Sequence, residues 1–206
     1  MHKPLLLSLL LLSATAGAAE VSLGYGDFYG RLKTVNKGHY QLVELAFSVP
    51  KTAGCRLLGG NIATESVQYP LTYTEDQRLF IPFDDALKTE RALVKLDIEG
   101  DAKDCGIAVQ LRTKQTQTDY SQAELIQIRQ EMDNLLDAMQ GFPMRYFRAP
   151  ITGLNFEFAA EAPVTVTLDG VRTETRGSFQ LSLQALNELK SLSFNLIPKV
   201  VSPWVQ

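Results

Sequence analysis

Two hydrophobic periods alternate along the chain, and together they predict a mainly β (α+β) protein with one long helix. Apolar residues at every second position indicate half-buried strands, whereas apolar residues three or four apart indicate an amphipathic helix. The two-residue period runs through residues 39–49, 67–73, 79–83, 94–98, 105–111, 154–158, 164–168 and 192–197. Short alternating strands with turn residues between them are typical of an antiparallel β-sandwich.

The clearest helix is predicted within residues 119–141. Residues 121–124 (Ser-Gln-Ala-Glu) have the pattern of a capping box, which marks a helix N-terminus. An apolar stripe at helical spacing follows, and it consists of Leu125, Ile128, Met132, Leu135, Leu136 and Met139. Gly141 ends the pattern. Such a stripe indicates core packing, with a partner-binding surface as the alternative. A shorter helix is predicted over residues 27–36.

A change of pattern divides the chain into three parts. Residues 113–119 are polar and separate the first group of strands from the long helix. We therefore expect a β-sandwich-like domain over residues 19–118, a connecting helix over residues 119–141, and a smaller β-rich part over residues 142–206 packed on the helix. In this last part Asp169-Gly170 follows one strand pattern and precedes another, which predicts a type I′ hairpin.

Residues 1–18 have the three parts of a cleavable secretory signal peptide. Lys3 supplies the positive charge, residues 5–12 form the apolar core, and Ala16-Gly17-Ala18 has the A-x-A form of a cleavage site. The apolar core is shorter than the roughly 20 residues that span a bilayer as a helix. We expect cleavage between Ala18 and Ala19 and a periplasmic mature chain, with a buried N-terminal helix as the alternative.

The chain has two cysteines, Cys55 and Cys105. If the chain is exported, their expected state is a disulfide. In an oxidising compartment such a pair normally forms a structural disulfide. No C-x-x-C motif indicates a redox centre, and two cysteines with one mature histidine make a poor zinc site. We therefore predict a Cys55–Cys105 disulfide within the first β-rich part.

Charge argues against nucleic acid as a partner. The formal net charge is −3 at pH 7, whereas phosphate binding requires a basic footprint. No stretch after the signal has the length and apolarity of a transmembrane helix. The expected partner is an envelope component or protein whose identity the sequence does not indicate, and no oligomeric state is indicated either.

Familiar catalytic and cofactor motifs are missing from the sequence. His39 is the only histidine left after cleavage, and no G-x-S-x-G elbow or phosphate-binding glycine loop is present. We therefore predict no cofactor and no metal site. An acidic cluster formed by Asp97, Glu99, Asp101 and Asp104 lacks the EF-hand pattern. Calcium binding there stays an alternative to the solvent face of a strand that runs into a charged turn.

The most suggestive stretch for binding is the proline-bounded segment 142–150. It places Arg145 and Arg148 beside Tyr146 and Phe147. Two guanidinium groups can clamp an anionic group that the aromatic rings flank. In the alternative, the two rings fill the junction between the helix and the last β-rich part, and the arginines are solvated.

Several features together resemble a family of exported gammaproteobacterial proteins known only as a domain of unknown function. The resemblance rests on the signal, the residues Phe-Tyr-Gly-Arg-Leu-Lys at 28–33, the strand over residues 42–49, the two cysteines, and the ending with Pro198 and Pro203-Trp204. The resemblance implies periplasmic residence and cysteines outside the cytoplasm. It implies no activity, cofactor or catalytic residue.

These features predict a non-catalytic periplasmic binding or accessory protein of the cell envelope. The contact surface would be a sheet face or the segment 145–148. One alternative is a hydrolase of envelope polymers that uses a carboxylate pair, for which we expect a deep cleft with two facing carboxylates. A second alternative is a structural component of an envelope assembly, for which the helix stripe should stay exposed in the folded monomer.

Overall fold

The fold is mainly β, with antiparallel sheets, as the strand pattern predicted. A computed structural model describes residues 18–51, 54–100, 105–159 and 163–205. The strands are β1 (Ala18–Gly24), β2 (Val43–Ser48), β3 (Arg56–Ala63), β4 (Gln68–Pro70), β5 (Thr72–Tyr73), β6 (Arg78–Phe80), β7 (Leu93–Glu99), β8 (Ala108–Thr113), β9 (Asp119–Ser121), β10 (Gly153–Glu157), β11 (Val164–Leu168), β12 (Val171–Thr175), β13 (Ser178–Ser182), β14 (Ser191–Phe194) and β15 (Val200–Trp204). The helices are α1 (Tyr25–Gly38), α2 (Asp85–Thr89), α3 (Gln122–Gln140) and α4 (Leu183–Glu188), with one 3₁₀ turn, η1 (Met144–Tyr146).

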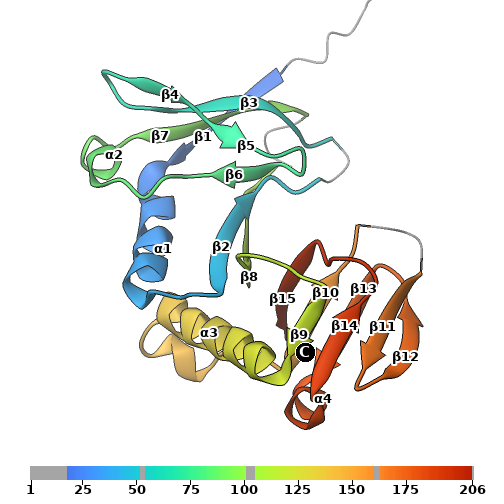
Figure 1. The fold of residues 1–206 in the computed structure, drawn as a ribbon. Coiled ribbons are helices and arrows are strands. Elements are labelled where there is room, and N and C mark those ends of the chain that lie inside the picture. The colour runs from blue at the N-terminus through green and yellow to red at the C-terminus, as the bar shows by residue number, and fades with distance from the viewer. Residues whose placement is uncertain (1–17, 52–53, 101–104, 160–162, 206) are drawn as a thin grey trace, which may run out of the picture.

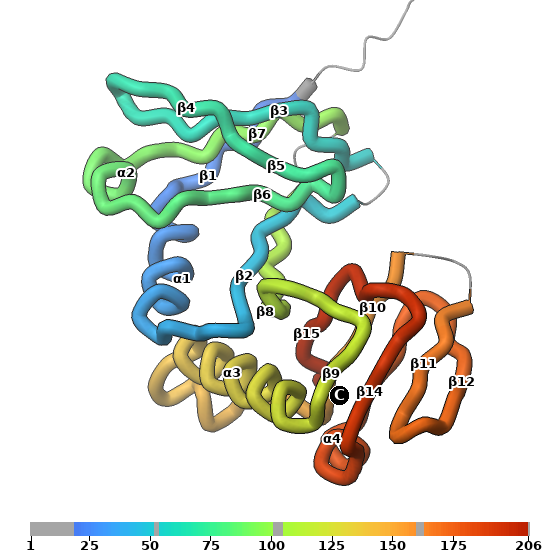
Figure 2. Tube along the Cα trace, in the orientation of Figure 1, coloured from blue at the N-terminus to red at the C-terminus, as the bar shows by residue number. Residues whose placement is uncertain are grey.

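The strands form four small sheets that are shared between two lobes (Figures 1 and 2). The N-terminal lobe contains the sheets β1-β7-β3-β4 and β5-β6-β2-β8, together with α1 and α2. The C-terminal lobe contains the sheets β13-β10-β15 and β12-β11-β14-β9, together with α3 and α4. The face-to-face packing that defines a β-sandwich stays a prediction for these sheets.

Strict alternation on β7 places one side of this strand in the core of the N-terminal lobe. Val94, Leu96 and Ile98 are buried, whereas Asp97 and Glu99 between and after them are exposed. The core also holds the two cysteines, whose sulfur atoms lie at disulfide distance, 2.08 Å. Cys105 precedes β8 rather than lying within a strand, as the alternation over residues 105–111 had predicted.

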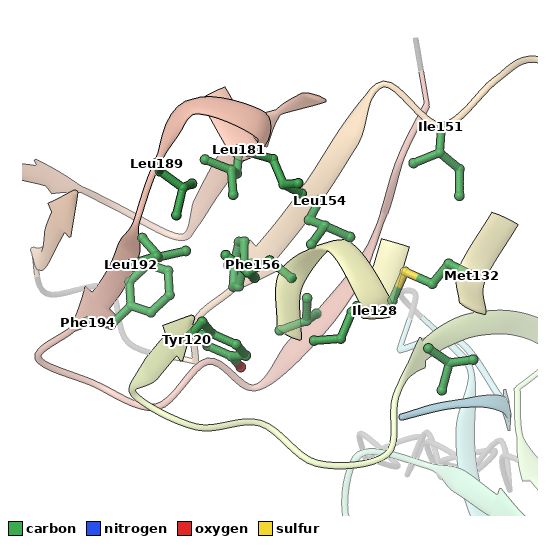
Figure 3. Close-up of a cluster of buried hydrophobic side chains, with 14 of the residues drawn as sticks. Tyr120, Ile128, Met132, Ile151, Leu154, Phe156, Leu181, Leu189, Leu192 and Phe194 are labelled. Atoms are coloured by element: carbon green, nitrogen blue, oxygen red, sulfur yellow. The ribbon is translucent and has the colours of Figure 1, made fainter. Parts of the chain in front are cut away.

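The helix α3 organises the core of the C-terminal lobe (Figure 3). Its stripe residues Leu125, Ile128, Met132 and Leu135 are fully buried, which confirms core packing. Ser121 caps the helix by accepting a hydrogen bond from the Glu124 amide, at 3.3 Å. In a capping box the Glu124 carboxylate would accept a hydrogen bond from the Ser121 amide. Here it accepts one from Gln117 Nε2 instead, at 2.7 Å.

The strands β2 and β8 pair with each other and contribute to both cores. Val43 of β2 and Leu111 of β8 are buried in the C-terminal core, whereas Phe47 of β2 is buried in the N-terminal core. Just before β2, the Leu42 amide donates to Glu131 Oε2 of α3 at 2.8 Å. The lobes are thus joined by a continuous strand pair and not only by a flexible connection.

Several elements differ from the sequence-based expectation, and β3 and α2 were not predicted at all. The alternating residues 67–73 form two short strands in different sheets, because the chain leaves β4 and joins β6 through β5. The first helix, α1, extends over 14 residues and ends at Gly38; His39, which follows it, has a φ of 48°. Among the described residues there are therefore two long helices, α1 with 14 residues and α3 with 19 residues, where the sequence predicted one. In the described part of the chain, no helix has the length and apolarity to cross a membrane.

Candidate functional site

The segment that follows α3 is the region that the sequence singled out for binding. Gly141, with a φ of 67°, ends α3, and the chain then passes through a cis Phe142–Pro143 bond into η1. The segment returns beside the C-terminal part of α3 before β10 begins (Figure 1). Helix α3, held in the core by its buried stripe, therefore gives this segment a fixed support.

Four large apolar side chains of this segment are exposed to solvent. The exposed fractions are 81% for Phe142, 58% for Met144, 66% for Tyr146 and 78% for Phe147. The rings of Phe142 and Tyr146 contact each other edge to face, with centroids 6.2 Å apart. We call these four residues the apolar loop surface. No other six-residue stretch of the described chain exposes four large apolar side chains.

Arg148 anchors the loop instead of facing a ligand. Its Nε donates to Asp137 Oδ1 at 2.6 Å and its Nη2 to Asp133 Oδ1 at 2.5 Å, and only 10% of the side chain is exposed. Burial acts to lower the pKa of Arg148, but the hydrogen bonds that it donates to Asp137 and Asp133 outweigh burial and raise the pKa above its ordinary value. Arg148 therefore stays charged and ties the loop to α3.

Arg145 has a different environment, on the outer side of the loop. Its Nη2 donates to the Tyr146 hydroxyl at 2.7 Å, and its guanidinium lies 4.8 Å from the centre of the same ring. The hydrogen bond to Tyr146 raises the pKa of Arg145. Arg145 is thus the one charged group of the pair that stays exposed, and it is stacked on an aromatic ring.

The structure separates the four residues that the sequence predicted to act together. Arg145 and Tyr146 lie side by side, Phe147 is exposed, and Arg148 is engaged by two carboxylates. A clamp made of both arginines is therefore not formed. The alternative, in which the two rings fill the junction with the last β-rich part, is wrong because both rings are exposed.

The spacing of Asp133 and Asp137, the acidic partners of Arg148, is visible in the sequence. Asp133 and Asp137 are four residues apart and therefore lie on the same face of α3, away from its apolar stripe. A buried, doubly paired arginine next to this helix could have been anticipated from that spacing. Whether Arg145 or Arg148 pairs with these two aspartates depends on the path of the chain after Gly141. Only the structure shows that path.

The other candidate residues of the sequence do not converge on a site. His39 lies at the C-terminal end of α1, and Asp97 and Glu99 lie on β7. Asp101 and Asp104 of the acidic cluster lie outside the described residues, as does most of the predicted signal; Ala18 and Ala19 lie at the start of β1. Among the described residues, no group of three or more His, Cys, Asp or Glu side chains is placed to hold a metal ion.

One cluster of charges was not anticipated from the sequence. Glu44 of β2, Arg78 of β6 and Arg112 of β8 come together on one face of the sheet β5-β6-β2-β8. The alternation in β2 places Glu44 on the polar face of its strand, which is the only sequence signal for it. Its partners lie on strands far apart in the chain.

Comparison with known proteins gives one result. No curated protein and no solved structure matches the chain significantly. A family match covers residues 17–158, which extends from the predicted cleavage site through the N-terminal lobe and into the C-terminal lobe as far as the end of β10. The ending with Pro203-Trp204 lies beyond the matched residues. Because the match covers more than half of the chain, the protein belongs to the family described as "Protein of unknown function (DUF2987)".

Proposed function

We propose that this protein is an exported, non-catalytic binding or accessory protein of the cell envelope, and that it docks onto a protein partner through the apolar loop surface. Export to the periplasm is supported by the signal pattern of residues 1–18. The observation that carries the proposal is the exposure of Phe142, Met144, Tyr146 and Phe147 on one anchored loop.

Exposed apolar side chains are common when they are scattered, but a contiguous group of them marks an interaction site. The residue types also fit, because Phe, Tyr, Met and Arg are enriched at the centres of protein–protein interfaces. Arg145, stacked on Tyr146, supplies the charged member of this set. This composition favours a protein partner over a bare lipid surface.

The anchor supports the same proposal. Two hydrogen-bonded ion pairs fix Arg148 to Asp133 and Asp137, so that the base of the loop is held before any partner arrives. A contact surface that is ordered in advance loses less conformational entropy on binding. The loop therefore combines an apolar exterior with a polar, rigid attachment.

The two alternative functions have less support. A hydrolase of this kind needs a carboxylic acid with a raised pKa, whereas the pKa values of Asp76 and Asp169 are lowered, so neither of these carboxyl groups suits that role. Lys199 and Lys51 lower the first, and the Ser191 and Lys190 amides lower the second. For a structural component, the exposed helix stripe that we expected is instead buried in the monomer.

A photo-cross-linking experiment tests the proposal. The mature chain carries a photoreactive residue at position 147, and a second version carries it at position 171 as a control. Val171 is a suitable control because it is as exposed as Tyr146 but lies on the hairpin of the C-terminal lobe. Irradiation in solubilised envelope should give one discrete protein adduct from position 147 and none from position 171.

Matched variants complete the test. Tyr146→Ser with Phe147→Ser should abolish capture of the cross-linked protein, whereas Val171→Ser with Ile197→Ser should leave capture unchanged. All four side chains are exposed, so neither pair should alter the melting temperature appreciably. Equal capture by both pairs would contradict the proposal. Binding to protein-free lipid vesicles that depends on Phe147 would identify a membrane as the partner and would also contradict it.

A further inference from the structure

A polar cleft lies where the sheet β5-β6-β2-β8 faces the C-terminal lobe. It has a volume of about 330 Å³ and is lined from one side by Ser48, Arg78, Gln110 and Arg112, and from the other by Glu157 and Lys199. The volume falls within the range of small-molecule sites, and junctions between folded units are frequent places for such sites. The cleft is formed by strands from both lobes.

Two arginines on the N-terminal side of the cleft share a single carboxylate. Arg78 Nη2 donates to Glu44 Oε1 at 2.7 Å, and Arg112 Nε donates to the same oxygen at 3.2 Å. About four fifths of each side chain is removed from solvent. Because one negative charge faces two positive charges, this group of three carries an excess positive charge away from bulk water.

Arg78 has an unused donor in this group. Its Nε is buried and has no hydrogen-bond acceptor among the described residues. Its guanidinium also lies 5.0 Å from the centre of the Phe80 ring, which holds the planar group in place. A buried donor without an acceptor is costly, and an added acceptor would remove that cost.

The other charges around the cleft limit what can enter. Lys199 Nζ and Asp76 Oδ2 lie 2.8 Å apart and join the two lobes, and Lys51 Nζ lies 3.2 Å from the other oxygen of Asp76. Glu157 lines the cleft as well, and its Oε1 accepts from Asn155 at 3.1 Å. The positive excess is therefore located at Arg78 and Arg112, because the third lining cation, Lys199, is paired with Asp76, and both Asp76 and Glu157 bring carboxylates to the lining.

We propose that the cleft binds a small molecule through an oxyanion group, a carboxylate or a phosphate, held by Arg78 and Arg112. The planar fork of an arginine side chain matches two oxygens of either group, and charge-assisted hydrogen bonds are the strongest that such a site can form. This site is distinct from the apolar loop surface and does not depend on the docking proposal.

A purely structural role for the three charges makes a different prediction. Glu44 and Arg112 are direct neighbours across β2 and β8, and opposite charges at such positions stabilise a sheet without any ligand. In that case Glu44→Gln would lower stability and would not change the affinity for anions. A binding site instead predicts that Glu44→Gln increases the affinity, because it releases both arginines from their competing carboxylate.

The test is a titration of the mature protein with inorganic phosphate and, separately, with succinate, at constant ionic strength maintained with sodium chloride. Binding is followed by the NMR signals of the arginine Nε–H groups and by calorimetry. We expect saturable binding of at least one probe, with changes at Arg78 and Arg112. The probe with the lower Kd distinguishes phosphate from carboxylate recognition.

Three variants decide the outcome. Arg112→Gln should weaken binding by about tenfold or more, because it removes a charge-assisted hydrogen bond. Glu44→Gln should tighten binding severalfold, and Arg56→Gln, which removes an exposed arginine paired with Glu99, should change nothing. If Arg112→Gln fails to fold, Arg78→Lys serves in its place, because it keeps the charge and loses the fork. The absence of saturable binding, or affinities that are equal in the native chain, Glu44→Gln and the arginine variant, would overturn the proposal.

Discussion

The two lobes bury their apolar side chains by different means. The N-terminal lobe places α1 and its strands around a core that includes Cys55 and Cys105, which are 50 residues apart in the chain. The C-terminal lobe packs its sheets against the stripe of α3, and Phe156 belongs to a group of contacting aromatic rings that includes Tyr120 and Phe194. No disulfide occurs among the described residues of this second lobe.

The difference shows what each region needs for stability. In the N-terminal lobe β7 pairs with both β1 and β3, which lie far from it in the chain, so a cross-link within this lobe removes much of the freedom of the unfolded state. The C-terminal lobe has a 19-residue helix with one continuous apolar face, which buries a large surface within one element. The loop and the cleft lie at the periphery of these two cores.

Removing the disulfide should have the largest effect and should act mainly on the N-terminal lobe. Closing a loop of 50 residues contributes about 4 kcal/mol in the chain-entropy description, so Cys55→Ser with Cys105→Ser should lose about that amount. Hydrogen exchange measures the effect amide by amide. We expect faster exchange in β3 and β7, with α3 as the internal control. An equal loss of protection in both lobes would contradict the comparison.

A cavity in the C-terminal core should have the next largest effect. Met132 is completely buried on the stripe of α3, and Met132→Ala should reduce the free energy of unfolding by about 3 kcal/mol. Urea denaturation measures this change. Met144→Ala is the matched control, because Met144 is exposed and its truncation should cost less than about 0.5 kcal/mol. Similar losses for the two methionines would show that Met132 does not belong to a tightly packed core.

Loss of the loop anchor should have a moderate effect on stability and a larger one on docking. Arg148→Ala leaves Asp137 without its partner and Asp133 with only the more distant Arg129, at 3.9 Å, and should cost about 1–2 kcal/mol. Arg145→Ala should leave stability unchanged because that side chain is exposed. Thermal unfolding measures both variants, and cross-linking from position 147 reports whether the loop keeps its shape. An unchanged cross-link in Arg148→Ala would show that the anchor does not order the apolar surface.

The smallest effect should come from the ion pair that joins the lobes. Hydrogen bonds from Lys199 and Lys51 lower the pKa of Asp76 below its ordinary value of 3.8. A depressed folded-state pKa means that the stabilisation is fully present above pH 3.8 and is lost as the pH falls through the folded-state value. Because the side chain is half exposed, the contribution should be about 0.5 kcal/mol or less. Unfolding at pH 6 and at pH 2.5 measures it, and Asp76→Asn should remove that part of the pH dependence.

Elements set by local chemistry could be predicted from the sequence. Ser121, the stripe and Gly141 fixed the extent of α3 to within a few residues. Asp169 and Gly170 both have positive φ, 48° and 86°, as the predicted type I′ turn requires, and β11 pairs with β12 across them. Ser182 caps α4 by accepting from the Ala185 amide at 3.2 Å. Each of these signals acts within a few residues of the chain.

Elements that depend on distant partners could not be predicted in this way. The alternation over residues 67–73 is the same whether it forms one strand or two, so the transfer from β4 to β5 follows only from the sheets that were available to pair. Glu44 has the pattern of a solvent-facing residue on β2. Its two partners, Arg78 and Arg112, line a cleft because the C-terminal lobe packs beside that face.

The sequence by itself determined the period of each segment, the caps and turns, the pairing of Cys55 with Cys105 and the presence of an arginine- and aromatic-rich loop. Only the tertiary structure decided that Arg148 is an anchor, that Phe142 and Phe147 are exposed, and that Arg78 and Arg112 share one carboxylate. The physical reason is that burial and charge pairing are properties of neighbours in space. A local pattern restricts the conformation of a residue, but it does not determine what packs against that residue.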